Sequence, residues 1–272
     1  PGQKYQVNGN EPILLDDPNK IWTVERGSIA LFAVTIKDGA IAGSRRYLCS
    51  IDRGFALFGT AISNSPSASL IIAVPIGETE LINLNRQYFH DLVTNTDAQA
   101  IAWIENWLQQ LSSTLSYLAI PAIQVRANSP AKYSLLKSQT LQSETDVCWL
   151  QLPQGSVNLL GFAELTLNPE TGLFPLNQKL WLEASEASQL TTTTTLAISN
   201  SHTIVTGLSQ FNTQILQAID IFDQRETETE VQRLRDRQRL NRQVTAEALG
   251  ELASTLNYQD GDFFLEGTPL LV

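Results

Sequence analysis

The stretch IWTVERGSIALFAVTIKDGAIAGSRRYLCSIDRGFALFGT, residues 21–60, consists of short runs of β-branched, aromatic and aliphatic residues separated by glycines. Two turn signals, Lys37-Asp38-Gly39 and Asp52-Arg53-Gly54, stand between apolar runs, as in β-hairpins. Four short strands are therefore expected within this stretch. The same alternation covers residues 13–86, with a polar break at SNSPSAS (63–69), and many short strands with regular turns indicate a sandwich, roll or barrel.

The composition is that of a folded globular chain that can bury a core. Its 272 residues are 43% hydrophobic and 17% charged, and the formal net charge is -10. Such an acidic balance argues against nucleic acid as a partner, because phosphates require a basic face. No apolar run is long enough to span a bilayer, and two cysteines are too few for a disulfide framework, so a cytoplasmic location is expected.

After residue 96 the period of the apolar residues changes from strand to helix. Residues 97–118 place Ile101, Ile104, Leu108 and Leu111 at spacings of three and four, and Asp97 is the expected N-cap. Trp103 and Trp107 share one face of this helix. We expect both tryptophans to pack on the preceding strands.

The second half of the chain repeats this order of strands followed by a helix. Residues 120–145 contain two prolines and many small polar residues and are interpreted as a connection with one short element. The run VCWLQLPQGSVNLL (147–160) then matches KIWTVERGSIALF (20–32) in order, with a tryptophan, a strand, Gly-Ser and another strand. The threonine run 191–195 is also expected in a strand. Two related β-roll modules are therefore predicted.

The last part, from residue 209 on, has a helical period with a polar middle. Ile215, Ile219 and Phe222 begin an apolar stripe. Residues 223–230 interrupt it, and it resumes at Val231, Leu234, Leu240, Val244 and Leu252. Five arginines lie between residues 233 and 242. A solvated helix or helical linker is expected, and a long coiled coil is not. The sharper alternative is that the arginines face an anionic membrane or an acidic partner.

The predicted fold class is α+β and mainly β, with two β-roll modules each followed by helix and then a long polar C-terminal helix. The predicted domains are 1–118, 119–222 and 223–272. The chain lacks methionine and ends on the apolar run Pro269–Val272, so we expect it to be part of a longer protein.

Few residues suggest catalysis or metal binding. The two histidines, His90 and His202, lie in different halves and are expected on the surface or in packing, while Cys49 and Cys148 lie in strand patterns as buried thiols. No phosphate-binding loop or nucleophile elbow is present. The expectation is a chain without catalytic residues, metal ligands or cofactors.

The segment Phe58-Gly59-Thr60, with Pro66-Ser67 a few residues later, resembles the binding corner of cyclic-nucleotide-binding β-rolls. In that family a Phe-Gly-Glu motif precedes a Pro-Arg pair. The glutamate binds the ribose and the arginine binds the cyclic phosphate. Here Thr60 and Ser67 stand at the glutamate and arginine positions, so a buried phosphate would lack its partner. The degenerate pocket of Gly59, Thr60, Pro66 and Ser67 is expected to bind neither cyclic AMP nor cyclic GMP.

A narrower resemblance rests on the first roll, on FPLNQKLWLEA (174–184), and on the Arg-rich helix before EALGELASTL and EGTPLLV. Together these segments resemble the N-terminal cytoplasmic region of ABC transporters that export NHLP-type bacteriocins. The resemblance implies a regulatory domain on the cytoplasmic side of the membrane, whose partners are the leader peptide, the rest of the transporter and a second copy. The alternative function is a sensor of a small molecule other than a nucleotide, and a third hypothesis is dimerisation through helix 97–118.

Overall fold

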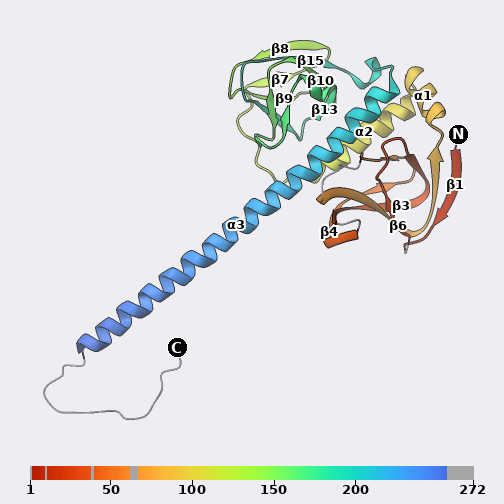
Figure 1. Cartoon of the computed structure of the whole chain (residues 1–272). Coiled ribbons are helices and arrows are strands. Elements are labelled where there is room, and N and C mark those ends of the chain that lie inside the picture. Colours follow the sequence, from red (N-terminus) through yellow and green to blue (C-terminus); the bar gives the residue numbers. More distant parts are fainter. Residues whose placement is uncertain (1, 10, 38–39, 62–66, 256–272) are drawn as a thin grey trace. The chain divides into compact units, whose positions relative to one another are not determined.

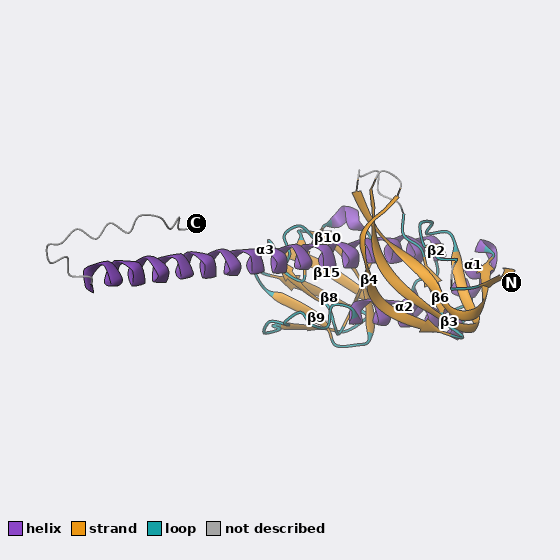
Figure 2. Cartoon of the chain, turned by 90° about the horizontal axis from the view of Figure 1, so that it is seen from below, coloured by secondary structure: helices purple, strands orange, loops and turns teal. Residues whose placement is uncertain are grey.

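The computed structural model describes residues 2–9, 11–37, 40–61 and 67–255. It divides into two compact units, residues 1–221 and 222–272, and the helix α3 (Ser201–Thr255) contributes to both. The described part is mainly β with a few helices, which confirms the predicted fold class (Figure 2). The described elements of unit 1 share one continuous main core, so the predicted division at residue 118 stays a prediction.

The first module of unit 1 is a curled antiparallel sheet. Its strands are β1 (Gly2–Val7), β2 (Ile13–Leu14), β3 (Ile21–Lys37), β4 (Ala40–Asp52), β5 (Ala56–Phe58) and β6 (Ser67–Leu84). The order is β1-β6-β3-β4, with β2 on β6 and β5 on β3. The long arms of β3, β4 and β6 curve together in Figure 2.

The prediction of four short strands in residues 21–60 is wrong in its count, because β3 does not turn at Gly27. The pairing of β3 with β6 shifts register on both sides of Arg26, and Gly27 has a φ of 80°. A register shift of this kind places an extra residue in one of the two strands. The extra residue forms a bulge, which bends the strand without ending it. A Cβ at Gly27 would lie 2.7 Å from Thr79 Oγ1, so the close approach of β6 also requires glycine here.

Two helices follow the first sheet, α1 (Arg86–Thr94) and α2 (Ala98–Ser113). Asp97 caps α2 as predicted, since its side chain accepts hydrogen bonds from the backbone N–H groups of Gln99 and Ala100. The predicted packing of both tryptophans on the roll is confirmed. Trp103 Nε1 donates to the Gly54 carbonyl at 2.7 Å, and the Trp107 ring lies edge-on to Phe58 at 5.9 Å.

The second module contains two small sheets. Its strands are β7 (Val125–Ala127), β8 (Ala131–Leu135), β9 (Thr140–Ser143), β10 (Val147–Gln154), β11 (Val157–Leu159), β12 (Thr166–Leu167), β13 (Phe174–Asn177), β14 (Trp181–Ala184) and β15 (Ser188–Thr193), with 3-10 turns η1 (Pro169–Thr171) and η2 (Thr195–Ala197). One sheet has the order β13-β10-β15-β8 and the other β12-β11-β14-β9-β7. The threonine run lies partly in a strand, as predicted, because β15 ends at Thr193.

The interpretation of residues 120–145 as a connection is wrong, because three strands, β7, β8 and β9, lie there. All four residues of β9 are buried, although its sequence TLQS is polar. The polar groups are satisfied by carbonyls of neighbouring loops, since Thr140 Oγ1 donates to the Ala122 carbonyl and Gln142 Nε2 to the Gln178 carbonyl. Burial with internal hydrogen bonds lets a strand form without an apolar run.

Helix α2 and the first part of α3 lie between the two modules, as Figure 1 shows. Gly207 allows α3 to approach the second module closely, because a Cβ there would lie 2.6 Å from Trp149 Cζ3 and 2.7 Å from the Leu173 carbonyl. Ile204, Leu208, Phe211, Ile215 and Ile219 form the buried stripe of α3. Of the three residues predicted to begin this stripe, Ile215 and Ile219 are buried and Phe222 is half-buried. The helix α3 touches both modules.

In unit 2 the helix continues through residues 223–230 without a break. Residues 224–240 are all exposed, which confirms the expectation of a solvated helix. Of the predicted third domain, residues 256–272 lie outside the described part of the chain.

Candidate functional site

Two of the four predicted pocket residues, Gly59 and Thr60, lie directly after β5 and are buried. Thr60 is 1% exposed, and its N–H donates to the Leu15 carbonyl at 3.0 Å. Pro66 lies outside the described residues, and Ser67 is the first residue of β6, where only the backbone is described. The structure therefore shows one half of the predicted pocket, which we call the β5 corner (Phe58, Gly59, Thr60 and Ala61).

The β5 corner is held by Asn212 of α3. Its side-chain NH₂ donates to the carbonyl of Phe58 at 3.2 Å and to that of Gly59 at 3.3 Å. Its Oδ1 accepts from Trp107 Nε1 of α2 at 2.8 Å. Asn212 is fully buried, so these bonds are shielded from water and join β5, α2 and α3.

A second residue of α3 and a tight backbone contact support the same corner. Ser209 Oγ, one helical turn before Asn212, accepts from the Ala61 N–H at 2.9 Å. On the other side, a Cβ at Gly59 would lie only 2.2 Å from the Asp17 carbonyl oxygen. The corner is therefore packed between α3 and the backbone before β3.

Phe58 has the one large side chain of the β5 corner, and aromatic rings surround it. Phe58 packs edge-on against Phe89 of α1, at 6.0 Å between centroids, and against Trp107 of α2. All three rings are essentially buried. This cluster fixes α1 and α2 to the end of β5, and edge-on ring pairs add to the stability beyond their buried area.

In the described residues, no cationic side chain bonds to the β5 corner. Among the described residues Thr60 Oγ1 has no hydrogen-bond partner, and the groups that contact the corner are neutral amides, hydroxyls and indoles. A buried phosphate requires a cation or several donors directed at it. Within the described residues, the Thr60 N–H donates to the Leu15 carbonyl and the Ala61 N–H to Ser209, while the carbonyls of Phe58 and Gly59 accept from Asn212.

Sequence reasoning missed Asn212 and Ser209. They belong to the helical segment 201–221, which carries the buried stripe with Leu208, Phe211 and Ile215. A polar residue inside an apolar helix face was the only available signal, because a buried amide requires a partner. Nothing in the sequence identified β5 and α2 as those partners.

One carboxylate outside the corner is perturbed. Burial raises the pKa of Glu105 on α2, a hydrogen bond from Thr195 partly offsets this, and the nearby charge of Asp146 adds to the increase. Thr195 Oγ1 donates to Glu105 Oε1 at 3.0 Å and accepts from Trp149 Nε1 at 3.1 Å. This chain of bonds links α2 to the second module.

The cysteines are buried, as predicted, and both are free thiols. Burial raises the pKa of Cys49 to about 12 and also raises that of Cys148. A thiol that is protonated at neutral pH is a poor nucleophile. These positions therefore provide packing within their modules.

The two histidines, distant in sequence, line one open pocket of about 550 Å³ at the starts of α1 and α3. His90 Nδ1 lies 2.9 Å from Ser201 Oγ, and Arg86 lines the same pocket. No group of three or more metal-ligating side chains was found among the described residues.

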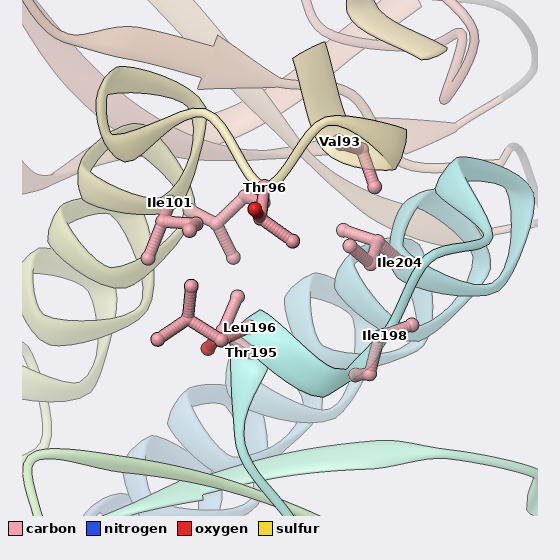
Figure 3. Close-up of a pocket in the computed structure, with 8 residues that line it drawn as sticks. Val93, Thr96, Ile101, Thr195, Leu196, Ile198 and Ile204 are labelled. Carbon is pink, nitrogen blue, oxygen red and sulfur yellow. The ribbon is translucent and has the colours of Figure 1, made fainter. Parts of the chain in front are cut away.

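A smaller pocket lies between α1, α2, η2 and α3 (Figure 3). Its lining is mostly aliphatic and consists of Val93, Thr96, Ile101, Ile104, Thr195, Leu196, Ile198 and Ile204. It leaves about 10 Å³ for the centre of a water-sized molecule. That is room for about one water, so this pocket is a packing defect and not a ligand site.

No family model and no curated protein matches the chain. Among solved structures, it is similar to a CooA mutant from Carboxydothermus hydrogenoformans, with 12% identity, a TM-score of 0.31, and coverage of 44% of this chain and 75% of the other. It is also similar to the regulatory domain of Toxoplasma gondii PKA with cAMP, with 11% identity, a TM-score of 0.26, and coverage of 83% of this chain and 85% of the other. A third similar structure is unbound oxidised CprK, with 12% identity, a TM-score of 0.29, and coverage of 50% of this chain and 68% of the other.

At these TM-scores the similarity carries no argument about ligand or role. In the described residues no helix is long and apolar enough to cross a membrane.

Because the Asn212 side chain makes three buried hydrogen bonds, we expect its truncation to lower the stability of the fold strongly. Asn212→Ala leaves the Trp107 indole N–H and two carbonyls without this partner, so the free energy of unfolding should fall by about 3 kcal/mol. Asn212→Asp should be at least as destabilising, because a buried carboxylate would face the Phe58 and Gly59 carbonyls. Urea unfolding followed by tryptophan fluorescence measures both.

Thr213→Ala is the matched control, since the Thr213 hydroxyl bonds only within the helix, to the Ser209 carbonyl. An equal loss in the control would contradict the special role of Asn212.

Glu105 predicts a pH dependence of stability. Because its pKa is raised in the folded state above the ordinary 4.5, the folded protein holds the proton more tightly than the unfolded chain. Its contribution to stability should therefore fall as the pH rises above 4.5. Glu105→Gln keeps an acceptor for Thr195 and removes the charge, so its Tm should exceed that of the wild type at pH 7.5. The two Tm values should converge near pH 4, and a constant difference at all pH values would refute this account.

Proposed function

We propose that the chain is a non-catalytic regulatory domain of a peptide-export ABC transporter, in which α3 responds to changes in the two β modules. The observation that carries the proposal is the bonding of Asn212 to the β5 corner. In the cyclic-nucleotide-binding rolls that the sequence resembles, this corner binds the nucleotide. Here the β5 corner is bonded to α3 instead. The proposal also rests on the transporter resemblance of the sequence.

Contacts of α3 with both modules support a relay. Asn212 and Ser209 bond to the first module, while Phe211 packs on Phe174 of β13 at 6.0 Å and Gly207 approaches Trp149 of β10. A displacement of either module must therefore repack the buried face of α3. Such coupling through a packed helix is a common route for regulatory changes.

The open edge of β4 supports the recognition of an extended leader peptide. Among the described residues, β4 pairs only with β3 and ends its sheet. The strand carries the exposed side chains of Tyr47 (56% exposed) and Ile41 (44% exposed), and Arg46 lies 5.6 Å from the ring centre of Tyr117. An added strand would gain backbone hydrogen bonds at this edge, and an apolar peptide side chain would contact Tyr47.

One observation favours the alternative function, a sensor of a small molecule other than a nucleotide. The open pocket at the starts of α1 and α3 is large enough for such a ligand and contains Arg86 and both histidines. It lies at the junction of α1 with α3, so occupancy there would also reach α3. A protein that serves only as such a sensor would not bind the leader peptide.

Binding of a leader peptide is the prediction that tests the proposed function. A fluorescent synthetic leader, encoded beside the gene of this chain, should bind with saturation, and a scrambled peptide should not. Tyr47→Asp should weaken binding about tenfold, because it removes an apolar contact and places a charge at the β4 edge. Leu136→Asp is the matched control, since Leu136 is 68% exposed and follows β8 in the other module. Fluorescence anisotropy measures all four cases.

Equal binding of the leader and its scrambled form would reject leader recognition. Equal weakening by Tyr47→Asp and Leu136→Asp would reject the β4 edge while leaving recognition in place. The transporter assignment is tested separately by the coding sequence after Val272. It should encode a permease and an ATP-binding loop, and a DNA-binding domain there would contradict it.

A further inference from the structure

The exposed part of α3 in unit 2 separates its charges along the helix. Residues 223–230 carry four carboxylates and one arginine, whereas residues 231–240 carry four arginines and one aspartate. Residues 224–240 are exposed throughout. A helix that is polar on nearly all sides gains little from its own sequence, so ion pairs along the helix or a partner must stabilise it.

Two exposed apolar side chains mark the boundary between the acidic and the basic part. Val231 is 40% exposed and Leu234 is 48% exposed, and their spacing of three places them on one face. On a heptad pattern, Thr227 and Gln238 continue this face on either side. Glu228 and Arg235 flank the face on one side, and Glu230 and Arg237 flank it on the other.

We propose that this segment, residues 224–240, is a self-association surface at which two copies of the chain pair as antiparallel helices. The two-fold axis lies between residues 232 and 233, so Val231 of one copy packs on the partner's Leu234. In this register Glu228 faces the partner's Arg235, and Glu230 faces the partner's Arg237. Two-fold symmetry doubles both ion pairs, so four Glu–Arg pairs surround the apolar centre.

The distribution of charge favours a second copy of this chain as the partner of the segment. It also favours antiparallel over parallel pairing of the two helices. In a parallel, in-register pair Glu230 would still face the partner's Arg235, but Asp223 would face the partner's Glu228. Like charges at these positions repel and specify against that pairing. The acidic part of one chain therefore matches the basic part of another copy only when the helices run in opposite directions.

The charged residues that flank the apolar face can still pair with a second copy, because their contacts within the helix are weak. The ion pair between Arg233 and Glu230 within the helix is 3.9 Å long, and both side chains are well exposed. Such a surface pair contributes little and exchanges partners readily. The apolar stripe of α2, the other surface considered for dimerisation, is buried inside unit 1. Self-association at α3 is independent of the proposed transporter function.

Charge exchange tests the proposed pairing without disturbing the core. The double variants Arg235→Glu/Arg237→Glu and Glu228→Arg/Glu230→Arg should each weaken dimerisation at least about tenfold, because all four pairs become repulsive. An equimolar mixture of the two should associate, since opposite charges meet again. The quadruple variant that combines both exchanges keeps the net charge of -10 and should dimerise like the wild type. Sedimentation velocity over a concentration series measures the association, and circular dichroism checks the fold.

A distance measurement tests the direction of the helices. With a spin label at Gln224→Cys, antiparallel pairing separates the two labels by about 25 Å along the axis, whereas an in-register parallel pair holds them about 10 Å apart. The native thiols are buried and should remain unlabelled in the folded protein. Concentration-independent monomers, equal association of all charge variants, or the short distance would each overturn the proposal.

Discussion

Burial of the Asn212 side chain imposes the constraint on which the arrangement of unit 1 depends. A buried amide must find partners for its donors and its acceptor, and here these are two carbonyls at the end of β5 and the indole of Trp107. The bonds fix α3 against the roll at one rotation and one height. With Gly207 closing the gap to Trp149, the same helix is also positioned against the second module. The two modules are therefore packed together through α3, and α2 bonds to the second module as well.

The same constraint changes what the β5 corner can do. A binding corner normally keeps its donors and acceptors for a ligand, whereas four backbone groups of this corner are bonded within the chain. Thr60 supplies a neutral hydroxyl, and Ala61 donates its N–H to Ser209. The functions proposed for this chain therefore rest on two surfaces, namely the β4 edge and the charged stretch of α3. Glu105 and the buried thiols support the interior and carry no reaction in this account.

Much of the fold was predictable from local pattern, and most of the candidate site was not. Asp97 and the stripe of α2 follow from capping and helical period, and the threonine run largely forms a strand, as β-branched residues favour. The strand β9 was missed because its buried residues are polar and satisfied by distant partners such as Gln178. The bulge at Gly27 was mistaken for a turn, since a positive φ serves both. Asn212 was missed because its partners lie more than a hundred residues away in sequence.

The most direct test of the account follows the Trp107 indole proton by NMR during a titration with cyclic AMP. This proton reports the bond between Trp107 and Asn212, beside the corner that would receive the nucleotide. The account predicts a signal that keeps its chemical shift and its slow exchange with water up to millimolar cyclic AMP. A saturable shift at micromolar nucleotide, or rapid exchange of the proton on addition, would contradict it.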